Sequence, residues 1–145
     1  MPRQSLLDYL EYFDRYGGDT ACVHRRGYRQ ARWSYRQVLE TARQFAQELE
    51  ARGVGRGERV LLWGENCAEW VAAFWGTLLR GAVVVPLDRI CSPEFAASVA
   101  RQAGARLVVS SQELVLPGDS TPALHFENLV SAIIRHDHRQ YPSPA

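Results

Sequence analysis

The sequence predicts an α/β fold in which a mostly parallel sheet with flanking helices follows one helix and a small β-hairpin. Two observations lead to this prediction. Short apolar runs without alternating polar residues recur in the second half of the chain, as strands buried on both faces of a parallel sheet require. Segments whose apolar residues have helical spacing separate those runs, and the connections are short. This order of elements is typical of a parallel sheet with right-handed crossovers.

The beginning of the chain is expected to form the helix and the hairpin. Residues 5–16 have apolar positions at helical spacing, and the pair Gly17-Gly18 ends this helix. Residues 21–33 then predict two short strands around a turn at Arg26-Gly27.

Residues 34–136 are expected to form the α/β core of a single domain that spans residues 1–140. Ser34 begins an amphipathic helix in which Gln37 completes a capping box, and Gly53 ends the helix. Apolar residues form one stripe along it: Val38, Ala42, Phe45 and Leu49, with Leu39 and Ala46 beside them. Polar residues occupy the rest of its surface: Arg36, Glu40, Arg43, Gln44, Gln47 and Glu48.

The core is expected to contain four strands, at residues 59–63, 82–87, 106–109 and 123–126. The helix predicted at 67–81 is apolar on nearly every side, so we expect it to be covered on more than one face. Asn66 is expected to cap that helix, and Ser92 to cap the next. Residues 127–137 predict a last helix, and residues 141–145 the start of a linker.

Composition excludes several kinds of chemistry. All 17 basic residues are arginine, so mechanisms that need a lysine amine, such as a P-loop lysine or a Schiff base, are ruled out. The net charge of +1 favours no nucleic-acid partner. No apolar run approaches the roughly 20 residues of a membrane span, and the N-terminus lacks the features of a signal peptide. Cytoplasmic localisation without a transmembrane segment is therefore expected.

The three cysteines, Cys22, Cys67 and Cys91, form no CxxC pair, so neither a zinc site nor a disulfide framework is predicted. Cys67 and Cys91 lie near predicted helix starts, where the pKa of a thiol can drop. A role as small buried apolar residues is nevertheless favoured.

Two loops have the appearance of ligand sites. Gly53, Gly55 and Gly57 are spaced like a phosphate loop, but a helix precedes them and a strand follows, the reverse of a dinucleotide fingerprint. A helix stop and turn is favoured there. The stretch WGENCAEW, residues 63–70, has the right order of strand and helix, yet Glu65 would repel an anion. A capping and packing role is favoured for it.

Charged and titratable clusters are also assigned structural roles. His136 and His138 flank Asp137, but a spacing of two places side chains on different helix faces, so a solvated helix end is favoured over a metal site. His24 and His125 lie in predicted strands without a nucleophile spaced like a triad partner. Basic and aromatic residues gather in the hairpin region: Arg25, Arg26, Arg29, Arg32 and Arg36 with Tyr28, Trp33 and Tyr35. An exposed hairpin with charged edges is favoured over a nucleotide-binding site.

The segment from Trp33 to Ser111 resembles a known family. WSYRQVLETARQFAQELEARGVGRGERVLLWGENCAEWVAAFWGTLLRGAVVVPLD, continued by SPEFAASVARQAGARLVVSS, is similar to the N-terminal subdomain of adenylate-forming, AMP-binding acyl-CoA synthetases. The matching positions are Ser34-Tyr35, 46–49, Gly53-Val54, Gly57-Glu58, Val60, Asn66, Glu69-Trp70, Gly76, 81–83 and 85–87. Within the family, EWVAAFWGTLLRGAVVVPLD most resembles long-chain fatty-acid–CoA ligases.

The resemblance implies a ligase that activates a carboxylic acid with ATP and magnesium to an acyl-adenylate, then transfers the acyl group to coenzyme A. The family's phosphate-binding stretch, ribose-binding aspartate and adenylation lysine have no counterparts here, so no catalytic, cofactor-binding or metal residue is carried over. We therefore expect an N-terminal fragment of a larger enzyme, inactive alone, with no cofactor bound. Its main partner would be the rest of that enzyme, and an exposed apolar patch on helix 67–79 could support a homodimer.

Three alternatives remain open. The parent could be an adenylation domain or a fatty-acyl-AMP ligase that delivers its product to a carrier protein. The chain could be a standalone, non-catalytic binding or interaction module that uses the arginine hairpin or an exposed apolar face. A small nucleotide-binding α/β protein is disfavoured because a phosphate loop is missing.

Overall fold

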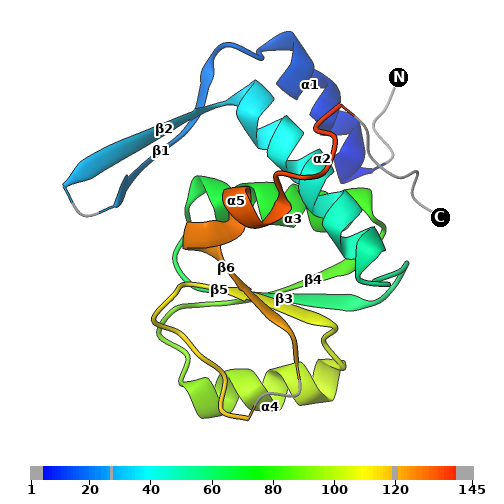
Figure 1. The fold of residues 1–145 in the computed structure, drawn as a ribbon, viewed down its shortest axis with the longest axis vertical. Coiled ribbons are helices and arrows are strands. Elements are labelled where there is room, and N and C mark those ends of the chain that lie inside the picture. The colour runs from blue at the N-terminus through cyan, green and yellow to red at the C-terminus, as the bar shows by residue number, and fades with distance from the viewer. Residues whose placement is uncertain (1–4, 27, 119–120, 140–145) are drawn as a thin grey trace.

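A computed structural model describes residues 5–26, 28–118 and 121–139 and has the predicted α/β architecture, with a four-stranded sheet and a separate two-stranded ribbon (Figure 1). Its elements in chain order are η1 (Leu6–Tyr9), α1 (Leu10–Arg15), β1 (Thr20–Arg26), β2 (Arg29–Ser34), α2 (Tyr35–Ala51), β3 (Arg59–Trp63), α3 (Ala68–Leu79), β4 (Val83–Leu87), α4 (Pro93–Ala103), β5 (Leu107–Ser110), β6 (Ala123–His125), η2 (Phe126–Asn128) and α5 (Leu129–Ile133).

The main sheet is parallel throughout, with the strand order β4-β3-β5-β6. Strand β3 is central: it pairs with β4 on one edge and with β5 on the other, and Leu61 is in register with both Val85 and Val108. The ribbon is antiparallel, with Val23 opposite Arg32 and Arg26 opposite Arg29. These pairings confirm the predicted parallel sheet and the predicted hairpin.

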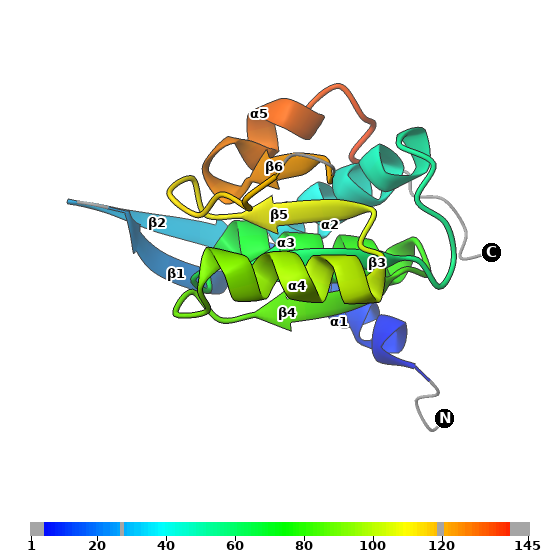
Figure 2. The ribbon, with the colours of Figure 1, turned by 90° about the horizontal axis from the view of Figure 1, so that it is seen from below.

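The sheet is covered on both faces (Figures 1 and 2). Helix α4 lies on one face, where Ala96 and Ala100 pack near Leu61 and Trp63 of β3. Helices α2, α3 and α5 lie on the other, in a core that includes the fully buried residues Phe45, Val60, Leu62, Leu107, Val109, Phe126 and Leu129. Both faces of β3 and of β5 are buried, and this explains why the sequences of these two strands are continuously apolar.

Helices α2 and α3 pack in close contact because Gly76 has no side chain. A Cβ atom added at Gly76 would lie 2.6 Å from the Ala42 carbonyl oxygen and 2.8 Å from Cδ1 of Phe45. The predicted capping box is present: the Gln37 amide N–H donates to Ser34 Oγ, and the Gln37 side chain accepts from the Ser34 amide. The predicted stripe of α2 is completely buried.

Helix α3 is covered more fully than its composition suggested. Leu79 packs with Leu10 of α1 and Leu39 of α2 in a second apolar layer, and Trp75 packs against the same cluster. Among the described residues, the exposed large apolar side chains include none from α3. On one face of α3, however, Trp70, Val71, Phe74, Trp75 and Leu78 are only partly buried. Helices α1 and α2 therefore reduce the expected apolar patch without removing it, and the homodimer stays a prediction.

Strand β4 differs from the prediction of a buried strand, because it lies at the edge of the sheet. The Val83 N–H donates to the Glu58 carbonyl, and the Leu87 carbonyl accepts from Gly64 N–H, so alternate residues from Val83 to Leu87 bond to β3. Pro86, in between, has its backbone nitrogen on the open edge. A proline there removes one donor from that edge and discourages pairing with another strand.

Glu48, assigned from sequence to the polar face of α2, is instead almost completely buried. Its carboxylate lies 2.7 Å from Arg52 Nε, 2.6 Å from a terminal nitrogen of Arg135 and 2.9 Å from His136 Nε2. Burial alone would raise the pKa of Glu48, but the hydrogen bonds of His136 and Arg52 and the charges of Arg52 and Arg135 lower it below its ordinary value. The cluster joins α2 to the segment after α5.

No helix within the described ranges is long and apolar enough to cross a lipid bilayer.

Replacing Glu48 with glutamine is expected to destabilise the fold by about 1–3 kcal/mol, since it removes charge-assisted hydrogen bonds at a buried position. Because the pKa of Glu48 is lowered, its stabilisation is complete above the ordinary carboxylate pKa and is lost as the pH falls through the folded-state pKa. Urea denaturation at neutral and acidic pH measures both effects. Glu50→Gln, at an exposed position of the same helix, is the control; equal stabilities of the two variants would contradict the prediction.

Candidate functional site

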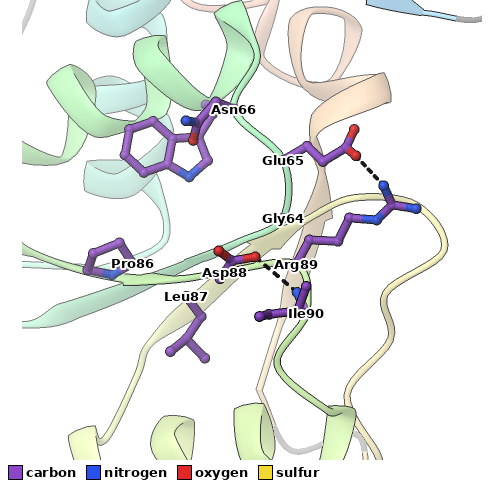
Figure 3. A pocket seen from close by; sticks show the side chains of 9 residues that line it. Gly64, Glu65, Asn66, Pro86, Leu87, Asp88, Arg89 and Ile90 are labelled. Atoms are coloured by element: carbon purple, nitrogen blue, oxygen red, sulfur yellow. Dashed lines mark hydrogen bonds and ion pairs between the residues drawn. The ribbon is translucent and has the colours of Figure 1, made fainter.

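An open cleft of about 450 Å³ lies at the carboxyl edge of the sheet, between the loops that follow β3 and β4. Residues 64–66 line one side and residues 86–90 line the other (Figure 3), and Trp70 also belongs to the lining. Helix α3 leaves β3 on one face of the sheet and α4 leaves β4 on the opposite face, so the two loops diverge. Ligands of open parallel sheets usually bind where the strand order reverses, which here is between β3 and β5, so the cleft lies beside that point, on the β4 side of β3.

Three polar contacts shape the rim of the cleft, and Figure 3 shows two of them, Arg89 with Glu65 and Asp88 with Ile90. Arg89 donates a hydrogen bond to Glu65 across the opening, and the two side chains form an ion pair. Asp88 Oδ1 accepts the Ile90 N–H at 3.0 Å, and the Asp88 carbonyl accepts the Cys91 N–H at 3.0 Å. This turn presents Ile90 almost completely to solvent. The lining therefore combines apolar surface with two carboxylates and one arginine that is already paired.

Gly64 is required at the base of the cleft. Its φ of 151° is a conformation that residues with a side chain rarely adopt. A Cβ atom at this position would lie 2.3 Å from Ser111 Oγ and 3.2 Å from the Ser111 nitrogen. The glycine lets β3 turn directly beside the end of β5.

The stretch WGENCAEW differs locally from the prediction. Cys67, in an extended conformation, is the N-cap residue of α3, and Asn66 instead lies exposed on the wall of the cleft. Burial raises the pKa of the Cys67 thiol to about 11, and burial together with the Glu69 charge raises that of Cys22. The thiols of Cys67 and Cys22 therefore fit small, partly buried apolar residues and not activated nucleophiles.

A buried cluster that sequence reasoning missed connects the ribbon to α3. The side chain of Glu69 is only 4% exposed, its Oε2 lies 2.5 Å from a terminal nitrogen of Arg26, and its Oε1 lies 3.7 Å from His24 Nε2. Both ring nitrogens of His24 and the Oε1 atom of Glu69 are buried without a hydrogen-bond partner. A cavity of about 170 Å³ borders His24 and Arg26 on one side and Ser111 and Phe126 on the other.

The remaining sequence candidates have structural roles. His136 contacts the buried Glu48 and is not part of a solvated helix end, since α5 already ends at Ile133. His138 lies 3.9 Å from Glu40, and His125 Nδ1 lies 3.5 Å from Ser110 Oγ. Within the described residues, no group of three or more His, Cys, Asp or Glu side chains could hold a metal ion.

The glycine-rich turn lies away from the cleft, before β3, and connects α2 to the sheet. Glu58 accepts the Gly55 N–H at 2.8 Å and pairs with Arg106. The Gly55 N–H that a bound phosphate would need is therefore already hydrogen-bonded to Glu58. This agrees with the prediction of a turn.

Comparison with known proteins identifies one matching family and several similar proteins. The family model described as AMP-binding enzyme matches residues 11–141. Similar curated proteins are a putative acyl-CoA synthetase, YngI, of Bacillus subtilis (37% identity over 60 residues; 41% of this chain, 11% of the relative) and the 3-hydroxybenzoate–CoA/4-hydroxybenzoate–CoA ligase of Thauera aromatica (34% over 82 residues; 57% and 16%). A third is the long-chain-fatty-acid–CoA ligase FadD13 of Mycobacterium tuberculosis (33% over 79 residues; 54% and 16%).

Solved structures with the same fold include an artificially fused adenylation–PCP di-domain, NpsA-ThdA, from Klebsiella oxytoca. It matches with a TM-score of 0.78 and 20% identity, over 98% of this chain and 26% of that chain. VinN in complex with L-aspartate matches with a TM-score of 0.76 and 26% identity, over 91% of this chain and 38% of that chain. The matched regions make up only 11–16% of the three curated relatives above.

Replacing Gly64 with alanine is expected to destabilise the fold by about 2–4 kcal/mol, because it adds backbone strain and a clash with Ser111. Adding Ser111→Ala to this variant should restore the stability lost through the clash with Ser111 Oγ. It should not restore the stability lost through the positive φ of residue 64. Gly18→Ala is the control, since nothing lies within 4 Å of a Cβ there. Chemical denaturation compares the unmodified chain with these three variants and with Ser111→Ala alone. The explanation fails if Gly64→Ala is as stable as the control, or if Ser111→Ala recovers nothing.

Proposed function

The chain belongs to the AMP-binding enzyme family. From this premise we propose that it forms the N-terminal part of an ATP-dependent ligase. This ligase would activate a carboxylic acid as an acyl-adenylate and transfer the acyl group to coenzyme A. The match of the family model to residues 11–141 carries the proposal, and the curated relatives named as acyl-CoA synthetases and CoA ligases support it.

A long-chain fatty acid is the acid that we favour. The stretch from Glu69 to Asp88 has the resemblance to fatty-acid ligases described above, and FadD13 is named as such a ligase. The hydroxybenzoate ligase of Thauera aromatica has similar identity over a similar length, so an aromatic acid is the nearest competitor. Fatty-acid metabolism in the cytoplasm would be the setting of the enzyme.

A second candidate is an adenylation domain that delivers its product to a carrier protein. The structural likeness to the NpsA-ThdA di-domain, which covers 98% of this chain, favours it specifically. Both candidates share the adenylation step and differ in the thiol that accepts the acyl group.

The described residues do not fit the phosphate groups of ATP. Glu65 and Asp88 place two carboxylates at the cleft, and its one arginine, Arg89, is already paired with Glu65. A phosphate cradle instead needs free backbone N–H groups or cations. Residues that hold ATP and magnesium would therefore belong to other parts of the enzyme, and the role of this chain would be to support them.

The chain alone is accordingly expected to release no pyrophosphate from ATP-magnesium in the presence of palmitate, hexanoate or 4-hydroxybenzoate. A coupled pyrophosphate assay measures this, with an active acyl-CoA ligase as the positive control. To exclude contamination, any activity must persist through two unrelated purification steps. Such persistent release would contradict the supporting role.

The thiol that accepts the acyl group can be identified with the full-length product of the gene that encodes this chain. We expect acid-dependent pyrophosphate release, followed by acyl-CoA formation when coenzyme A is added. Mass spectrometry separates an acyl-CoA from an acylated carrier protein. Transfer to a phosphopantetheinylated carrier but not to coenzyme A would favour the second candidate, and no acid-dependent pyrophosphate release would contradict both.

A further inference from the structure

The ribbon, defined as β1 (Thr20–Arg26) and β2 (Arg29–Ser34), projects from the body of the molecule (Figures 1 and 2). No third strand of the described chain pairs with it. A sheet of two strands is marginally stable in water, and three strands or packing against a helix are normally needed. The outward backbone N–H and C=O groups of this two-stranded sheet therefore have no strand partner in the described residues.

The inner face of the ribbon is held in place. His24 and Arg26 point to the buried Glu69 of α3, as the 3.7 Å and 2.5 Å contacts show. At the base, the Tyr35 N–H donates to the Asp19 carbonyl and the Arg36 N–H to the Gly17 carbonyl, both at 3.0 Å. These contacts fix the ribbon before any partner binds, which reduces the ordering cost of binding.

The outer face is exposed and positively charged. Val23 and Arg25 of β1 share it with Gln30 and Arg32 of β2, and all four side chains are exposed. Residues 20–34 contain four arginines and no acidic residue. Because the whole chain has a net charge of +1, the ribbon carries +4 and the remaining residues carry −3. The positive charge of the protein is thus concentrated on this element.

The two edges of the ribbon differ. His24, Arg25 and Arg26 of β1 border the small cavity against the body, which restricts access to that edge. On β2, residues 29, 30 and 32 are exposed. The β2 edge is therefore the open one.

We propose that the β2 edge of the ribbon binds an acidic, extended segment of a partner protein as a third strand. Backbone hydrogen bonds would supply affinity, as in other cases of strand addition, and the arginines would select acidic side chains at alternate positions. A single-stranded nucleic acid would also be attracted by the charge, but it could not use the open backbone edge. This inference does not depend on the proposed ligase function.

The test uses the isotope-labelled 145-residue chain and three synthetic peptides: EVEVEVEV, its lysine counterpart KVKVKVKV, and EVEPEVEV, in which proline removes a backbone donor. EVEVEVEV is expected to shift the amide NMR signals of the ribbon in a saturable manner and to slow hydrogen exchange along β2. The lysine peptide should not bind, and the proline peptide should bind more weakly. Arg32→Glu should reduce affinity about tenfold, equivalent to about 1.4 kcal/mol.

The matched control is Arg101→Glu, which makes the same charge change at an exposed position of α4. It should leave binding of EVEVEVEV unchanged. The proposal is overturned if EVEVEVEV does not bind, if both arginine variants lose affinity equally, or if the proline peptide binds as well as EVEVEVEV, because charge alone would then explain the interaction. Tighter, Arg32-dependent binding of an oligothymidylate would assign the ribbon to nucleic acid and would also overturn it.

Discussion

Burial of strand β3 on both edges and both faces is the constraint on which the rest of the fold depends. It is paired with β4 from Arg59 to Trp63 and with β5 from Val60 to Trp63, so both of its edges are used within the sheet. Its side chains alternate between the α4 layer, reached by Leu61 and Trp63, and the layer of α2, α3 and α5, reached by Val60 and Leu62. A register slip of one residue would exchange these two sets, so the packing of both layers fixes one register.

The same strand positions the cleft. At its carboxyl end Gly64 passes beside Ser111, and the chain then enters α3 while the neighbouring loop leads to α4. Divergent loops create a space but do not determine its chemistry. Here Glu65 and Asp88 make the lining acidic, which is unfavourable for phosphate or carboxylate groups. A fold typical of ligand-binding proteins therefore has, in these residues, a scaffold without an anion site.

Features that depend on local pattern could be predicted from the sequence. The capping box of Ser34 and Gln37 and the apolar strand at 59–63 follow from short-range rules, and both are present. Glu48 and Glu69 could not be assigned correctly, because their burial depends on Arg135, His136 and Arg26, which are far away in sequence. The edge position of β4 was missed for a similar reason: its apolar side chains alone do not show which strand ends the sheet.

The exclusive use of arginine connects these observations. Carboxylates at four separate positions, Glu48, Glu58, Glu65 and Glu69, each pair with an arginine from another segment or turn. A planar guanidinium suits such fixed contacts, because it presents several donors in a rigid arrangement. In the described residues, Arg25, Arg29 and Arg32 form no ion pair, and all three belong to the ribbon. The paired arginines hold segments of the molecule together. Arg36, Arg59 and Arg101 also form no ion pair in the described residues and lie on other elements. In the ribbon, however, three such arginines lie together beside an unpaired strand edge. This combination makes the ribbon, more than the acidic cleft, the surface at which we expect this chain to bind a partner.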